Sequence, residues 1–80
     1  MKHVILTHTV SQGYIPAYTN KNGSPIIYAD EAEAVTKITN AMFEYNTARM
    51  NENEFQDLIT EPEDFAAPLE EAQKEYNIKI

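Results

Sequence analysis

Residues 30–50 read DEAEAVTKITNAMFEYNTARM and predict one long helix on which the rest of the fold depends. Asp30 is a favoured N-cap residue, and Glu33 follows three positions later, as in a capping box. The apolar residues recur at the i, i+3, i+4, i+7 spacing of one helix face: Ala34, Val35, Ile38, Ala41, Met42, Tyr45 and Ala48. We therefore expect a helix from about Glu31 to about Met50 that packs this stripe against a sheet.

The residues before this helix predict three β-strands. Residues 2–11, KHVILTHTVS, are rich in β-branched side chains and form the first strand. Residues 14–19 and 25–29 are expected to form a hairpin, because the Asn-Gly pair at 22–23 suits the positive φ angles of a tight turn. Pro16 cannot donate to a ladder, so strand 14–19 is expected at an edge of the sheet.

Shorter elements are expected after the long helix. A second helix would begin at Asn51 or Asn53 and end before Pro62. Residues 69–76, LEEAQKEY, follow a proline that fits a first helical position, and they predict a third helix. Residues 77–80 alternate in polarity and would add a short strand to the sheet.

Together these elements predict an α+β fold in a single domain over residues 1–80. A small, mainly antiparallel sheet of three to four strands would carry the long helix, followed by one or two short C-terminal helices. The chain has no cysteine, so its stability must come from a small core or from a partner subunit. The predicted core contains Val4, Leu6, Val10, Ile15, Ile26, Tyr28, Val35, Ile38, Met42, Tyr45, Leu58, Ile59 and Leu69.

Charge is distributed unevenly along the chain. Residues 1–29 hold two lysines and no acid, whereas residues 50–80 hold nine acids against two lysines, a formal −7. The whole chain also carries a formal net charge of −7. Such an acidic balance disfavours a direct grip on nucleic-acid phosphates or anionic lipid, and it favours a basic protein partner.

Nine residues are candidates for contact with such a partner. Phe43 is an aromatic side chain on the polar face of the long helix, where it would act as an apolar anchor unless the C-terminal segment covers it. Charge would come from Glu52, Glu54, Asp57, Glu61, Glu63, Asp64, Glu70 and Glu71. Alternatively, these acids serve only to keep a small protein soluble.

Catalytic and metal-binding motifs do not stand out. His3 and His8 are five residues apart on a predicted strand, so they point to opposite faces and do not suit one metal ion. We expect one histidine to be exposed and the other to be hydrogen-bonded at the rim of the sheet. The sequence contains no GxSxG, glycine-rich phosphate loop or HExxH pattern. We therefore expect no enzyme activity, no cofactor and no metal.

The N-terminal apolar run, Val4–Leu6, is much shorter than the roughly 7–15 residues of a signal-peptide core. A membrane span needs an even longer apolar run, of roughly 20 residues. We therefore expect no contact with a membrane and a cytoplasmic location.

From Tyr14 to about Tyr45, a hairpin with an Asn-Gly turn and a short strand precede a helix that begins D-E-A-E-A. This layout resembles small acidic phage-encoded accessory proteins, a class that includes anti-CRISPR proteins and other host-takeover inhibitors. The resemblance implies a nucleic-acid mimic that binds and occludes a nucleic-acid-handling complex in the host cytoplasm. The alternative is a small structural subunit that pairs with itself as a homodimer.

Overall fold

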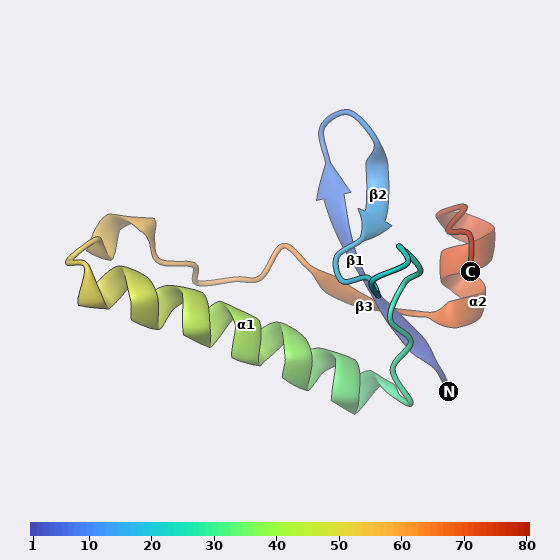
Figure 1. Cartoon of the computed structure of the whole chain (residues 1–80), viewed down its shortest axis with the longest axis horizontal. Coiled ribbons are helices and arrows are strands. Elements are labelled where there is room, and N and C mark those ends of the chain that lie inside the picture. The colour runs from blue at the N-terminus through green and yellow to red at the C-terminus, as the bar shows by residue number, and fades with distance from the viewer.

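The computed structural model describes all 80 residues and shows an α+β fold with a three-stranded antiparallel sheet (Figure 1). The elements in chain order are β1 (His3–Thr9), β2 (Gly13–Pro16), α1 (Glu31–Asn51), the 3-10 turn η1 (Phe55–Asp57), β3 (Phe65–Pro68) and α2 (Leu69–Glu75). The long helix and the helix after Pro68 are therefore confirmed. The expectation of a sheet with one long helix on it is also confirmed.

Strand β1 is the centre of the sheet, whose order is β2-β1-β3. Both neighbours run antiparallel to it, and Leu6 lies opposite Pro16 on one side and Phe65 on the other. Pro16 thus lies at the end of an edge strand, as predicted, because a residue without an N–H cannot serve a central ladder.

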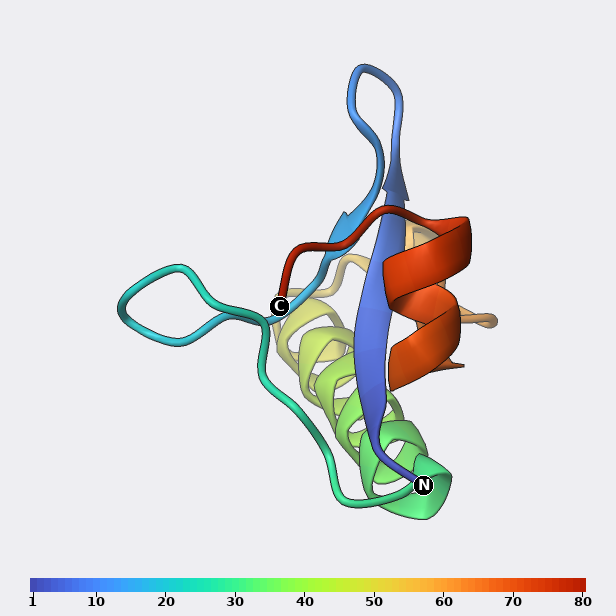
Figure 2. The same cartoon turned by 90° about the vertical axis from the view of Figure 1, so that its right-hand side faces the viewer.

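Both faces of β1 are buried, and each packs against a different helix. Val4 and Leu6 pack with Ala72 of α2, whereas Ile5 packs with Ala34 and Ile38 of α1. Figure 2 shows β1 with α2 on one side and α1 passing behind it. Because side chains alternate along a strand, the consecutive run Val4–Leu6 fills two separate small cores.

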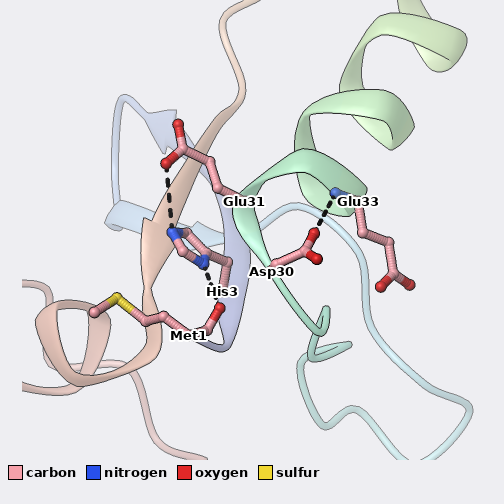
Figure 3. Close-up of polar contacts among 5 residues, drawn as sticks. All are labelled: Met1, His3, Asp30, Glu31 and Glu33. Atoms are coloured by element: carbon pink, nitrogen blue, oxygen red, sulfur yellow. Dashed lines mark hydrogen bonds and ion pairs between the residues drawn. The ribbon is translucent and has the colours of Figure 1, made fainter.

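The start of α1 is fixed by the predicted cap at Asp30 (Figure 3). The Asp30 carboxylate accepts a hydrogen bond of 2.8 Å from the backbone N–H of Glu33. In return the Glu33 carboxylate accepts one of 3.1 Å from the N–H of Ala29. These bonds satisfy donors that a helix N-terminus leaves free, so the position of the helix start follows from local sequence.

The predicted hairpin over 14–29 forms only in part, and its strand at 25–29 is wrong: Thr19 pairs with Pro25 in one antiparallel bridge, and the Ile26 N–H donates a 3.1 Å hydrogen bond to the Tyr18 carbonyl. Its turn does form, and Gly23 has a φ of +88°. However, β2 pairs with β1, and it covers only the Leu6–Thr9 part of that edge. The start of the edge is left for Tyr28, which exchanges backbone hydrogen bonds of 3.0 and 2.8 Å with His3. Residues 25–29 therefore contribute two isolated bridges, Pro25 with Thr19 and Tyr28 with His3, rather than a strand.

Two further predictions near the C-terminus are wrong. The expected second helix is reduced to η1, because the chain turns through Asn53 in a left-handed conformation with φ of 60°. Residues 77–80 form no strand, because Asn77 has a φ of 54° and turns the chain so that Ile78 enters the core beside α2. The third strand is instead β3.

The predicted core is correct near β1 and wrong along the outer half of α1. Of the predicted residues, Val4, Leu6, Tyr28 and Ile38 are buried, and Ile15, Ile26, Met42, Leu58 and Leu69 are half-buried. The exposed ones are Val10, Val35, Tyr45 and Ile59. Val10 lies in the turn between β1 and β2. Tyr45 is exposed because the 21 residues of α1 span about 32 Å, much more than a four-residue strand can cover, and Ile59 lies on the segment that returns along this outer half. Val35 lies near the start of α1 and is 44% exposed there.

Candidate protein-binding arm

The outer half of α1 and the segment that returns from it project away from the sheet, to the left in Figure 1. We call residues 41–64 the arm. No residue between Ile38 and Ala67 is buried. The radius of gyration is 13.8 Å, compared with about 12 Å for a compact domain of this length, and the extents are 42 × 29 × 24 Å. The arm therefore presents its side chains to solvent on most sides.

Side-chain contacts hold the returning segment along α1. The Asn46 amide nitrogen donates a 2.8 Å hydrogen bond to the carbonyl of Ile59, and its amide oxygen accepts one of 2.8 Å from the N–H of Ile59. At the tip, the Arg49 guanidinium donates to the Glu54 carboxylate, and the Glu54 N–H donates to the Arg49 carbonyl at 2.8 Å. Residues 52–64, which we call the strap, are thus bonded to the helix at two places.

Most of the net charge of the molecule is on the arm. It contains seven acids and one base, Arg49, for a formal −6, while the remaining residues contain six acids and five lysines, for −1. Arg49 is engaged within the arm, with Glu54 and with the ring of Tyr45, whose centroid is 5.0 Å away. The hydrogen bond with Glu54 raises the pKa of Arg49. The other arm acids except Glu52 have no ion pair: Glu44, Asp57, Glu61, Glu63 and Asp64.

Large apolar side chains are exposed among these acids. Phe43 is 69% exposed and Phe55 is 59% exposed. The alternative in which the C-terminal segment covers Phe43 is therefore wrong. Tyr45, Met50 and Ile59 are also exposed. Five exposed large hydrophobic residues within the arm need an explanation, because isolated exposed residues are common but several in one region often mark contact surfaces.

A cleft of about 300 Å³ lies between α1 and the strap, and we call it the acidic cleft. Its helix side is formed by Ile38, Ala41, Met42 and Tyr45. Its strap side is formed by Ile59 and Glu61–Asp64, and Tyr18 closes one end. Burial, then the charge of Asp64, then that of Glu44 raise the pKa of the Tyr18 phenol. The cleft therefore has apolar walls under a negative potential.

The structure divides the predicted partner-binding acids into three places. Glu52, Glu54 and Asp57 lie at the tip of the arm, and Glu61, Glu63 and Asp64 line the acidic cleft. Glu70 and Glu71 lie in the first turn of α2, on the other side of β1 from α1. The acids of the distal half therefore do not form one continuous patch.

Sequence reasoning missed three residues that shape this surface: Tyr18, Glu44 and Asn46. Tyr18 was expected in a strand, and Glu44 attracts no attention as a solvent-facing helix residue. Asn46 holds a segment 13 residues further along the chain. No local motif marks such a pairing, so only the three-dimensional arrangement reveals it.

The two histidines lie on opposite faces of β1, and each has the kind of environment that was expected. His3 is 5% exposed, and its Nδ1 is 2.9 Å from the Met1 carbonyl oxygen (Figure 3). Its Nε2 is 3.9 Å from the Glu31 carboxylate. His8 is exposed, with its ring centroid 4.9 Å from that of Tyr14. No group of three or more histidine, cysteine or acidic side chains is placed to hold a metal ion.

The largest hollow of the molecule, about 670 Å³, is away from the arm. It lies between residues 12–16 and the C-terminal residues 75–79. Glu75 and Lys79 are the charged residues that line it, and their formal charges cancel. We therefore regard the smaller acidic cleft as the better candidate site, because there apolar area and unpaired charge coincide.

Comparison with protein-family models, with curated proteins and with solved structures gave no match for this chain. Neither helix combines the length and the apolar character that crossing a membrane requires.

Proposed function

We propose that this protein is a non-enzymatic inhibitor or adaptor that docks its arm onto a basic surface of a partner protein. The observation that carries the proposal is the coincidence, on one projecting arm, of a formal −6 and a group of exposed apolar side chains. Opposite charge accelerates and orients association, whereas desolvated aromatic side chains contribute most of the binding energy.

The proposed contact residues are those of the arm. Phe43 and Phe55 are the apolar anchors, and the charge comes from Glu52, Glu54, Asp57, Glu61, Glu63 and Asp64. Glu70 and Glu71 are left out of this surface because they lie on α2, beyond the sheet.

A surface that normally binds nucleic-acid phosphates is the partner chemistry that fits best. Carboxylates spaced along a helix and its strap can take the positions of phosphates in a cationic groove. This agrees with the resemblance to phage-encoded inhibitors, and we propose that the protein acts in the cytoplasm, in that case of the host. It would bind the nucleic-acid-handling complex and not the nucleic acid.

Charge reversal on the arm tests the proposal. Glu61→Lys/Glu63→Lys changes two exposed acids that have no ion pair, so the fold should be unaffected. Glu71→Lys/Glu75→Lys makes the same change in net charge on α2 and is the matched control. Both variants and the parent, carrying an affinity tag, are used to capture partners from lysate at about 0.1 M and 1 M salt, where the Debye length falls from about 10 to 3 Å. Circular dichroism verifies folding.

We expect a partner with a basic surface that is captured by the parent at low salt, released at high salt and lost with the arm variant. The α2 variant should capture it as the parent does. If the arm variant still captures the same partners, or if both variants lose them equally, a specific role for the arm is wrong.

The exposed apolar residues of the arm also favour a second candidate, a subunit that pairs with itself. The dependence on salt separates the two functions. Arms that each carry a formal −6 repel one another, so a homodimer joined through them should be strengthened by salt. Docking onto a basic partner should instead be weakened by it. Sedimentation velocity of the purified chain at both salt concentrations measures the first effect directly.

A further inference from the structure

The acidic cleft has a chemistry that is more specific than a negative surface. Ile38 is buried at its floor, and Met42 and Tyr45 add polarisable and aromatic surface. Glu61 and Glu63 are exposed at the rim, and Asp64 is half-buried. A ligand that satisfies both parts must have an apolar stem and a positively charged end.

The charge of this rim is not neutralised within the molecule. None of Glu61, Glu63 and Asp64 forms an ion pair. Lys37 has its Nζ 4.8 Å from the centroid of the Tyr18 ring, and it forms no ion pair with any acid. Burial raises the pKa of the Tyr18 phenol, and the charges of Asp64 and Glu44 raise it further, so the electrostatic potential at this ring is negative.

The size of the cleft restricts the ligand further. Its volume of about 300 Å³ is at the lower end of the roughly 300–1,000 Å³ of small-molecule sites. This suits one long side chain better than a cofactor. Arginine and lysine both have an aliphatic stem that packs on apolar surface while the head remains polar.

The tyrosines favour arginine over lysine. A planar guanidinium stacks on aromatic rings and donates to more than one carboxylate, whereas an ammonium is a compact, strongly hydrated charge. The arm already contains this combination in its own Arg49, which lies over Tyr45 and hydrogen-bonds to Glu54. Tyr45 is also a wall of the acidic cleft, so an incoming side chain would pack on it beside Arg49.

We propose that the acidic cleft receives an arginine side chain that projects from the basic surface of the partner. Its stem packs on Met42 and Tyr45, and its guanidinium lies between Asp64 and the strap acids Glu61 and Glu63. This inference rests on the proposed function and deepens it, because it makes the cleft the anchor point of the docked arm.

The test uses the full chain, labelled with ¹⁵N, and a defined probe. The probe is a capped heptapeptide with two arginines, and its twins carry citrulline, which has the same shape without charge, or lysine. Amide shifts are followed by NMR during titration at about 0.1 M salt. We expect saturable shifts at residues 38–45 and 59–64 with the arginine peptide, none with the citrulline peptide, and at least threefold weaker binding with the lysine peptide.

Two variants separate the cleft from charge in general. Met42→Trp fills the cleft with apolar volume and keeps every acid, and it should abolish the localised shifts. Glu61→Gln/Asp64→Asn should weaken binding of the arginine peptide at least tenfold, while Glu71→Gln/Glu75→Gln on α2 should leave it unchanged. The folded amide spectrum of each variant shows that its structure is intact.

Several results would overturn the inference. These are the absence of shifts at millimolar peptide, equal binding of the citrulline peptide, or shifts spread over the arm tip and α2 that persist in Met42→Trp. The proposed function fails by a different measurement, namely unchanged capture of the partner by Glu61→Lys/Glu63→Lys. If Met42→Trp loses the peptide but still captures the partner, the arm docks through its outer surface and the arginine anchor is wrong.

Discussion

Replacing Asn46 with alanine should release the Ile59 part of the strap from α1 while the rest of the fold remains in place. The Asn46 side chain makes two hydrogen bonds of 2.8 Å to the backbone of Ile59, and alanine can make neither. The other side-chain bond between the strap and the helix, from Arg49 to Glu54, lies at the tip of the arm, so the Asn46 bonds are the ones beside the acidic cleft. The change therefore tests whether the acidic cleft exists in solution.

The magnitude follows from the number and exposure of these bonds. A typical hydrogen bond contributes about 0.5–1.5 kcal/mol, and the lower end applies here because both bonds are exposed, so the pair contributes about 1 kcal/mol. Alanine is a better helix former than asparagine by up to about 0.7 kcal/mol. The two effects nearly cancel in the free energy of global unfolding. They do not cancel at the strap, where about 1 kcal/mol corresponds to about a fivefold change in an opening equilibrium.

Native-state hydrogen exchange measures the local effect. The Ile59 amide should exchange about fivefold faster in Asn46→Ala. The free energy of global unfolding, measured by urea titration, should change by no more than about 0.5 kcal/mol. Asn40→Ala is the matched control, since Asn40 lies on an exposed part of the same helix and makes no side-chain hydrogen bond. Unaltered exchange at Ile59 in Asn46→Ala would refute the bonding of the strap to the helix.

Three other outcomes follow from the fold. Leu6→Ala should lower the free energy of unfolding by about 2–5 kcal/mol out of a total of about 4–12 kcal/mol, because Leu6 is fully buried. A urea titration measures this loss, and Val10→Ala, at an exposed position, should be almost neutral in the same assay. Asp30→Ala should cost about 0.5–2 kcal/mol and Asp30→Asn much less, as thermal unfolding would show, because the amide oxygen can still cap α1. Burial, then Asp64, raise the pKa of the Tyr18 phenol above 10.0, so the folded chain keeps this proton to higher pH than the unfolded one. The associated stability should be present below about pH 10 and lost as the pH rises further, and Asp64→Asn should move the NMR titration of the Tyr18 ring to lower pH.

Helix α1 was predictable because its signals are local. The cap at Asp30, the acid three residues later and the apolar spacing all lie within the helix, and its observed end at Asn51 is one residue from the expected one. The sequence does not show how far the sheet extends beneath the helix. For this reason Tyr45 was assigned to the core although it lies beyond the sheet on the arm.

Strand β3 was not predictable for the opposite reason. Its sequence, FAAP, contains two alanines and a proline, which have little intrinsic preference for strands. Its conformation is set by its neighbours, because small side chains such as Ala67, opposite Val4, allow the sheet to lie close to both helices. In the same way, the excess of acids could be read from the sequence, but the cleft could not. The cleft depends on contacts between residues that are far apart in the chain.

The partition of charge between the arm and the rest of the molecule gives the protein a permanent electric dipole. With a formal −6 at one end of a body 42 Å long and −1 on the remainder, the centre of charge lies far from the centre of mass. In the field of a cationic surface such a molecule experiences a torque before any contact is made, so it rotates until the arm leads. Encounters would then be productively oriented more often than random tumbling allows, even if no single ion pair in the final complex were strong.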